Sequence, residues 1–110
     1  MAAIANLTID QGATFTSDVT VKDANGNAFD LTGYTARAKL AKGYQSTKTR
    51  QDFTATIANA TGGVVTLSLT ATQTTALDDT RYVYDLEIVT GDVVTRVIEG
   101  LISVRPQVTT

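Results

Sequence analysis

The stretch YVYDLEIVTGDVVTRVIEG, Tyr82 to Gly100, is the most regular part of the chain. Apolar and polar residues alternate in two runs, as they do in half-buried β-strands. Thr90-Gly91-Asp92 separates the runs, and glycine and aspartate favour tight turns. The stretch therefore predicts an antiparallel hairpin whose first strand turns one row of side chains inward, namely Tyr82, Tyr84, Leu86 and Ile88.

The second run continues as one long strand from Val93 to Val104. Its inward register changes sense along the way, which a β-bulge permits, and Gly100 marks the kind of position where bulges occur. The pattern leaves open whether Val97 or Ile98 faces inward. Pro106 ends the strand, because proline has no backbone N–H to donate.

Earlier segments show the same alternation and predict five more strands. They are Ile4–Ile9, Phe15–Val21, Tyr34–Leu40, Phe53–Ile57 and Val64–Thr70. Between the fifth and sixth strands, Thr70 and Gln73 have capping-box spacing, which predicts one or two helical turns. Asp23–Asn27 reads DANGN and predicts a tight turn, because its glycine is misplaced for a calcium loop.

The pattern as a whole predicts an all-β fold: an immunoglobulin-like antiparallel β-sandwich of about seven strands, with one short helical turn between the fifth and sixth strands. A chain of 110 residues has the size of one domain, so we expect a single sandwich over residues 1–110. Without cysteine, packing and hydrogen bonds must stabilise it. Four residues are expected in the core: Leu67, Leu69, Leu86 and Ile88.

Charge and hydropathy argue against several partners. The net charge is -2, which gives no broad attraction to nucleic acid or to anionic membranes. No apolar run approaches the ~20 residues that cross a bilayer. The N-terminus lacks a basic start and an apolar signal core, so we expect synthesis in the cytosol without a signal peptide.

Catalytic side chains are scarce. The chain has no histidine or cysteine, which removes the commonest general base and the sulfur nucleophile. The carboxylates of Asp78, Asp79, Asp85 and Glu87 are interpreted as solvated charge, because Asp85 and Glu87 fall on the outward face of a strand. We therefore expect no enzymatic activity, no cofactor and no metal site.

RAKLAKGYQSTKTR, Arg37 to Arg50, holds five of the nine basic residues. The favoured interpretation is a solvated strand face followed by a mobile loop over Gly43–Gln51, and the alternatives are a phosphate or saccharide contact or a protein interface. The candidate contact residues are Arg37, Lys39, Lys42, Tyr44, Lys48 and Arg50.

Two tyrosines of the hairpin share a face. At most one of Tyr82 and Tyr84 is expected to be a corner tyrosine, whose hydroxyl bonds to backbone a few residues upstream. The alternative is that both are simply core aromatics.

LDDTRYVYDLEIVTGDVVTRVIEGLISVRPQVT, Leu77 to Thr109, resembles the C-terminal half of small immunoglobulin-like modules in tailed-bacteriophage virions. The resembling features are Tyr82, YDLEI at Tyr84–Ile88, the Gly91-Asp92 turn, Gly100-x-Ile102-x-Val104 and Val108-Thr109. GATFTSDVTVKDANGNAFDLTGYTARAKL, Gly12 to Leu40, is similar to the opening of the same family. Such modules include the N-terminal sandwich of siphophage upper-baseplate proteins and short virion proteins of phages that infect marine cyanobacteria.

The resemblance implies a non-enzymatic structural or assembly component of the virion, in the baseplate, neck, fibre or capsid surface. Its expected partners are other virion proteins and copies of itself, with a trimer slightly preferred because phage appendages are commonly threefold. Pairing is expected through the edge of Ile4–Ile9 or through the C-terminal tail. In the alternative, the first strand pairs within its own sandwich and the tail is disordered. A second functional hypothesis is an adhesion or carbohydrate-binding sandwich in which Tyr44 touches sugar.

Overall fold

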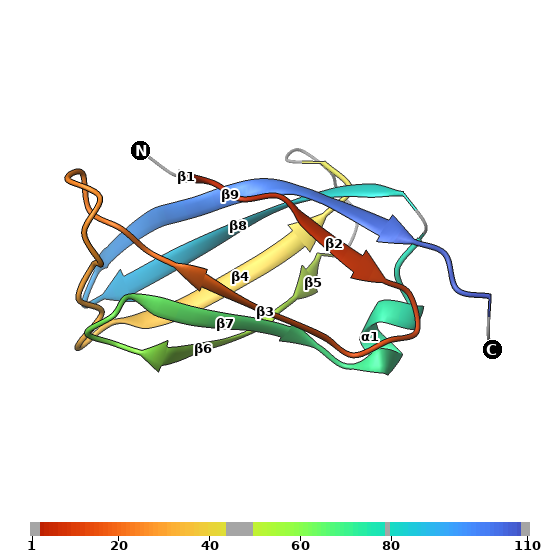
Figure 1. Ribbon diagram of the computed structural model, residues 1–110, viewed down its shortest axis with the longest axis horizontal. Coiled ribbons are helices and arrows are strands. Elements are labelled where there is room, and N and C mark those ends of the chain that lie inside the picture. Colours follow the sequence, from red (N-terminus) through yellow and green to blue (C-terminus); the bar gives the residue numbers. More distant parts are fainter. Residues whose placement is uncertain (1–2, 44–49, 79, 109–110) are drawn as a thin grey trace.

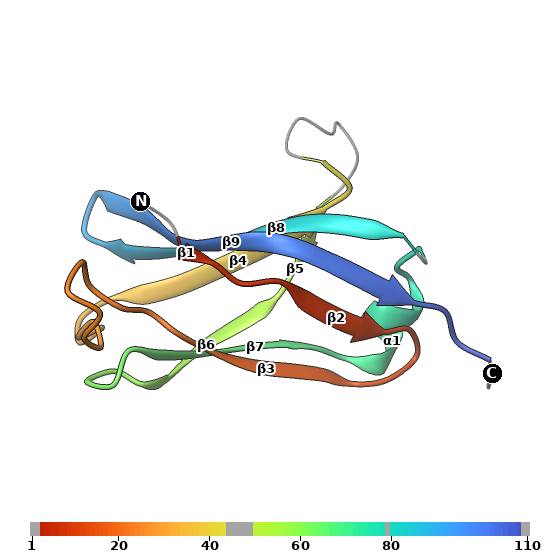
Figure 2. The ribbon, with the colours of Figure 1, turned by 45° about the horizontal axis from the view of Figure 1, so that its top comes forward.

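The computed structural model describes residues 3–43, 50–78 and 80–108. Two β-sheets pack face to face (Figure 1), and Figure 2 separates the layers. One sheet has the order β1-β9-β8-β4-β5, with β2 also beside β9, and the other has the order β3-β7-β6. The all-β, immunoglobulin-like sandwich is therefore confirmed: β4, β8 and β9 take the places of strands C, F and G, opposite strands B, E and D.

The strand bounds follow the predicted segments closely. The larger sheet contains β1 (Ala3–Ile4), β2 (Leu7–Asp10), β4 (Thr35–Ala41), β5 (Gln51–Asp52), β8 (Arg81–Thr90) and β9 (Val93–Arg105). The smaller sheet contains β3 (Phe15–Thr20), β6 (Thr54–Asn59) and β7 (Val64–Leu69). The pairings are antiparallel except that β1 and β2 run parallel to β9.

One of the seven predicted strands is divided in two, and one is preceded by an additional short strand. The first becomes β1 and β2, with Ala5 and Asn6 between them. The fourth, predicted over Phe53–Ile57, is β6, and the unpredicted short strand β5 ends just before Phe53. At Phe53 the chain passes from one sheet to the other, while the backbone N–H of Phe53 donates to the carbonyl of Ala38 at 3.0 Å. The expected loop over Gly43–Gln51 ends one residue early, because Gln51 already pairs with Leu40. Residues 44–49 lie outside the described ranges.

The expected helical turn is α1 (Ala71–Thr75). The Thr70 hydroxyl accepts from the Gln73 N–H at 3.2 Å, and the Gln73 side chain accepts from the Thr70 N–H at 2.8 Å, which confirms the capping box. Thr74 is fully buried, accepts from the Gly12 N–H at 3.1 Å and donates to the Ala13 carbonyl at 2.9 Å. This threonine fastens α1 to the turn after β2, a role that its sequence context did not indicate.

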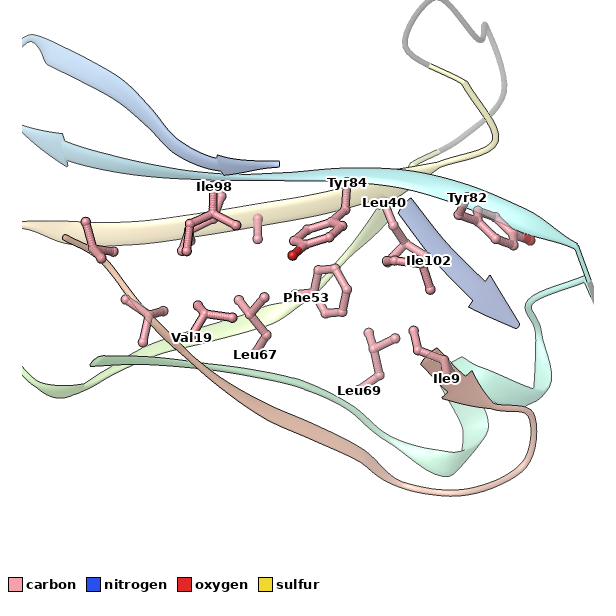
Figure 3. Close-up of a cluster of buried hydrophobic side chains, with 14 of the residues drawn as sticks. Ile9, Val19, Leu40, Phe53, Leu67, Leu69, Tyr82, Tyr84, Ile98 and Ile102 are labelled. Atoms are coloured by element: carbon pink, nitrogen blue, oxygen red, sulfur yellow. The ribbon is translucent and has the colours of Figure 1, made fainter. Parts of the chain in front are cut away.

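The core lies between the sheets, where side chains from both interdigitate (Figure 3). The predicted core residues Leu67, Leu69, Leu86 and Ile88 are all buried, as expected. Phe53 packs edge-on against Tyr84, with ring centroids 6.0 Å apart. The predicted in-and-out alternation of β7 and β8 is therefore confirmed.

The bulge in β9 lies at Val97 and not at Gly100. Leu86 pairs with Ile98 while the next residue, Glu87, pairs with Arg96, so Val97 is the extra residue. Ile98 is the residue that faces inward, and it is buried. The register change expected along this strand is thus present, but the glycine near it has a different purpose.

Gly100 allows the first strand to approach β9 closely. A Cβ atom at this position would collide with the carbonyl oxygen of Ala5 and would lie 3.1 Å from the Tyr84 ring. The Tyr84 hydroxyl donates to that same carbonyl. At the break between β1 and β2, Gly100 thus leaves room for the Ala5 carbonyl, and the Tyr84 hydroxyl binds that carbonyl.

Tyr82 is the corner tyrosine. Its hydroxyl accepts from the backbone N–H of Asp78, four residues upstream, at 2.8 Å. This contact confirms the corner interpretation for Tyr82. Because the Tyr84 hydroxyl also bonds to backbone, neither tyrosine is simply an apolar core residue.

The N-terminal strand stays within its own sandwich, which was the alternative to pairing with a neighbour. Both β1 and β2 pair with β9. After β9 ends at Arg105, the Gln107 N–H donates to the Gln11 side chain at 3.1 Å, while Gln11 itself donates to the Leu77 carbonyl at 2.7 Å. The start of the tail is therefore tied back to the fold, and residues 109–110 lie outside the described ranges.

Candidate functional site

The outer face of β4, β8 and β9 gathers charged side chains from three strands. Arg37 on β4 lies opposite Glu87 on β8, and Lys39 lies opposite Asp85. Glu87 in turn lies opposite Arg96 on β9. This last pairing depends on the bulge at Val97, which sets Arg96 on the outer face while Ile98 stays in the core.

Most of these charges are paired. Arg37 Nε lies 2.8 Å from Glu87 Oε1, and Arg96 Nε lies 3.2 Å from Asp85 Oδ2. Lys39 Nζ lies 3.3 Å from Asp52 Oδ1. Asp85 and Glu87 do face outward as predicted, but they are ion-paired and only partly exposed, so the interpretation as merely solvated charge is corrected.

These side chains surround a shallow hollow of about 350 Å³, which we call the outer-face depression. Its basic lining residues are Arg37, Lys39, Arg50 and Arg96, its acidic ones are Asp85 and Glu87, and Ala41 and Val83 are among its small apolar ones. Burial raises the pKa of the Asp85 carboxyl above its usual value, and the nearby Arg96 guanidinium opposes that shift. The floor of the depression is thus partly shielded from water.

The six predicted contact residues do not all lie at the same place. Arg37, Lys39 and Arg50 lie together around the outer-face depression. Lys42 lines a neighbouring hollow, where it is paired with Asp78, and this hydrogen bond raises the pKa of the Lys42 ammonium. Tyr44 and Lys48 lie outside the described residues.

Three site residues were missed as site residues by sequence reasoning. Arg96 was not singled out at all, and Asp85 and Glu87 were set aside as solvated. These residues could have been found from the cross-strand register of β8 and β9, which places residues about ten positions apart in sequence opposite each other in the hairpin. The position of the bulge was needed to read that register.

A second feature is a set of four exposed apolar side chains on the two strands at one border of the larger sheet. Ile4, Val93, Val94 and Leu101 are 75%, 60%, 47% and 40% exposed, and all lie on β1 or β9. We call this set the β1–β9 margin. Among the described residues, the other large exposed apolar side chain is Val108, which follows β9 in the tail.

The turn at Asp23–Asn27 is confirmed as structural. The Asp23 side chain accepts from the N–H groups of Asn25 and Asn27 at 2.9 and 3.0 Å. Within residues 3–43, 50–78 and 80–108, no cluster of three or more acidic, histidine or cysteine side chains could hold a metal ion. The same ranges contain no helix of the length and hydropathy that a bilayer crossing needs.

Comparison with known proteins gives a likeness of fold. The structure is similar to InlP of Listeria monocytogenes, with a TM-score of 0.50 at 15% identity, and the match covers 94% of this chain and 28% of that one. The chain thus spans under a third of the length of InlP. No family model and no curated protein matches the sequence.

Two further structures are more distant. The Lin-41 filamin domain has a TM-score of 0.41 at 15% identity, with 89% of this chain and 82% of that one covered. A family 123 glycoside hydrolase from Clostridium perfringens has a TM-score of 0.41 at 10% identity, with 97% and 24% covered. At these levels of identity and similarity, none of the three likenesses indicates an activity or a partner.

Proposed function

We propose that this chain is a non-enzymatic structural and assembly component of a tailed-bacteriophage virion. The sequence resemblance over Leu77–Thr109 and Gly12–Leu40 supports the proposal. Several residues that carry it are structurally important here: Tyr82 forms the corner, and Gly100 admits the first strand. The proposal covers the baseplate, neck, fibre or capsid surface without a choice among them.

The observation that carries the assembly role is the β1–β9 margin. Val93 and Val94 expose apolar side chains on the two faces of the start of β9, and exposed apolar surface of this kind can serve as a protein contact surface. Val93 and Val94 lie on the part of β9 before Ile98, where no strand among the described residues pairs on the side away from β8. A neighbouring protein can therefore bury apolar side chains and pair with open backbone at the same place. We expect other virion proteins and copies of this chain as the partners.

The test is the composition of purified particles. Mass spectrometry of virions should detect this chain in stoichiometric amount, and immunogold labelling of intact particles should place it at one structure of the virion. Particles that form normally and lack the chain would contradict the proposal. The glycan-binding alternative depends on Tyr44, and a glycan array on which Tyr44→Ala abolishes binding would replace the proposal with that function.

A further inference from the structure

The turn at Asp23–Asn27 contains an asparagine that is followed by glycine. The chain has four asparagines, and in the other three the next residue is alanine or leucine. The backbone nitrogen of the next residue can attack the side-chain carbonyl carbon of an asparagine. Glycine hinders this approach least, because it has no Cβ atom. The sequence of the turn, DANGN, therefore makes Asn25 chemically distinct among the asparagines.

The structure leaves Asn25 open to this reaction. Asn25 and Gly26 are both exposed, and their turn projects from one end of the sandwich, in orange in Figure 1. A Cβ atom built on Gly26 would meet no heavy atom within 4 Å beyond the neighbouring residues of the chain. Within residues 3–43, 50–78 and 80–108, the Asn25 side chain has no hydrogen-bond partner. The turn thus has room for a ring to form between Asn25 and Gly26.

The other three asparagines are held by hydrogen bonds. Oδ1 of Asn6 and Oδ1 of Asn59 each accept from a backbone N–H at 3.0 Å. The backbone carbonyl of Asn27 accepts from the Asp23 N–H at 2.8 Å. Each of these bonds restrains either the side chain that would be attacked or the backbone that would have to rotate. Structure and sequence therefore single out the same asparagine.

Asp23 restrains the turn in which Asn25 lies. Its side chain accepts from the N–H groups of Asn25 and Asn27 at 2.9 and 3.0 Å, and its carbonyl accepts from the Gly26 N–H at 3.0 Å. The Gly26 nitrogen must leave that carbonyl before it can reach the Asn25 side chain. Each such bond stabilises the turn by only about 0.5–1.5 kcal/mol. An exposed turn held in this way opens often compared with a slow covalent step.

We propose that Asn25 is a site of spontaneous deamidation and that Asp23 sets its rate. The Gly26 nitrogen loses its proton to hydroxide and forms a bond to Cγ of Asn25. The bond from Cγ to the side-chain nitrogen breaks, and ammonia leaves a cyclic imide behind. Water then adds to one of the two imide carbonyls and opens the ring, which gives aspartate or isoaspartate.

The modification changes both charge and backbone at residue 25. Either product adds a carboxylate beside Asp23, so the net charge falls from -2 to -3 (-2 - 1 = -3). Isoaspartate also lengthens the backbone of the turn by one methylene group. Chains that are kept at alkaline pH therefore become a mixture of three forms. This chemistry belongs to the folded chain itself and does not depend on the proposed function.

Peptide mass spectrometry of the full chain tests the site. After incubation in mildly alkaline buffer, Asn25 should show the mass increase of an amide that has become an acid. Part of the product should accept a methyl group from protein isoaspartyl methyltransferase. Asn6, Asn27 and Asn59 in the same sample are internal controls and should remain asparagine.

Variants of Asp23 test the restraint. Asp23→Ala should raise the deamidation rate about tenfold, because it removes two of the bonds that hold the turn closed. Asp23→Asn keeps a side-chain acceptor and should react at nearly the rate of the parent. Asp92→Ala, which removes an exposed carboxylate from a different turn, is the matched control and should leave the rate unchanged. Circular dichroism should show that all three variants are folded.

Four outcomes would overturn the proposal. Asn25 that stays intact while the free peptide VKDANGNAFD, residues 21–30, deamidates in the same buffer would show that the folded chain does not react. Equal modification of all four asparagines would remove any special role of the turn. Aspartate without isoaspartate would exclude the cyclic imide. A rate in Asp23→Ala at or below that of the parent would show that Asp23 does not restrain the reaction.

Discussion

Tyr84 connects the core to the first strand through a single hydroxyl group. Its ring is buried against Phe53, and its hydroxyl donates to the Ala5 carbonyl between β1 and β2. Burial raises the pKa of the Tyr84 phenol to about 12. Ionisation is therefore disfavoured in the folded state, because the phenolate would be poorly solvated and could no longer donate to the Ala5 carbonyl.

This pKa predicts a loss of stability at alkaline pH. An unfolded tyrosine titrates near pH ~10. The pKa of Tyr84 is higher in the folded state. The stabilisation that comes from its protonated hydroxyl is therefore fully present below the unfolded pKa of ~10 and is lost as the pH rises to about 12. Urea unfolding across this window should show a steeper fall in the free energy of unfolding for the parent than for Tyr84→Phe. Identical pH profiles for the two proteins would contradict the assignment.

Gly100 provides a second prediction at the residue scale. Gly100→Ala places a Cβ atom against the Ala5 carbonyl, so the first strand must move or the Tyr84 ring must shift. Overpacking of this kind should lower the free energy of unfolding by about 1–3 kcal/mol. Ser103→Ala, at an exposed position of the same strand, should change the urea midpoint little. Equal urea midpoints for both variants would show that the close approach of Gly100 to the Ala5 carbonyl does not limit the size of residue 100.

The sequence predicted which way individual side chains face better than it predicted which residues they contact. Alternation placed Leu86 and Ile88 inward correctly, because strand periodicity is a local property. The partners of Tyr82, Tyr84 and Gly100 could not be assigned in the same way. The Tyr82 contact required the course of the chain before β8. The other two required the position of Ala5, which is 79 residues from Tyr84 and, by subtraction (100 − 5), 95 residues from Gly100.

At the scale of elements, the bulge in β9 gives a sharp test of register. Deleting Val97 joins Arg96 directly to Ile98, which restores plain alternation and keeps both on their present faces. Deleting Leu101 instead moves Ile102 and Val104 from the core to the outer face, because a one-residue shift inverts a strand. Circular dichroism should show a cooperative unfolding transition for the first deletion and none for the second. The reverse result would contradict the register.

The packing between sheets gives a second test at this scale. Leu86 on β8 is fully buried, so Leu86→Ala should lower the free energy of unfolding by about 2–5 kcal/mol. Thr66 on β7 faces outward, with its hydroxyl bonded to Asp18 at 2.6 Å, so Thr66→Ala should cost far less. Urea midpoints that shift equally in the two variants would disprove the inward and outward assignment.

The same bulge explains why only half of the candidate site was predictable. The basic stretch of β4 can be read directly from the sequence, and it places Arg37 and Lys39 on one face. Arg96 reaches that face only because Val97 is extra, and local pattern allowed the register change anywhere along the strand. The sequence also grouped Lys42 with the others, whereas its pairing with Asp78 draws it into a separate hollow.

For the whole molecule, the two surface features have different physical character. The outer-face depression is charged, so contacts there should weaken with added salt. The β1–β9 margin is apolar, and contacts there should persist in salt because hydrophobic association is not screened. An association of this chain that persists in added salt would therefore point to the margin and not to the depression.

The proposed homo-oligomer is tested by sedimentation equilibrium at micromolar concentration. A mass above that of the monomer is expected, with a trimer preferred by analogy with threefold phage appendages. Removing Met1–Asn6 would not be a clean test, because it also deletes β1 and the Ala5 carbonyl that accepts from the Tyr84 hydroxyl. Val93→Lys with Val94→Lys is cleaner, because both side chains are exposed and lie outside the core. This double variant should be monomeric, since charge on the margin opposes burial.

The control for that experiment is Thr56→Lys, which adds an exposed charge to β6 in the other sheet and should leave the mass unchanged. If the parent chain is strictly monomeric, self-association through the margin is wrong, and the exposed valines must serve a different protein. If both lysine variants dissociate the oligomer, the contact does not depend on the margin in particular. Only selective loss in the Val93 and Val94 variant places the interface on β9, because that outcome alone links association to the exposed apolar side chains beside its open edge.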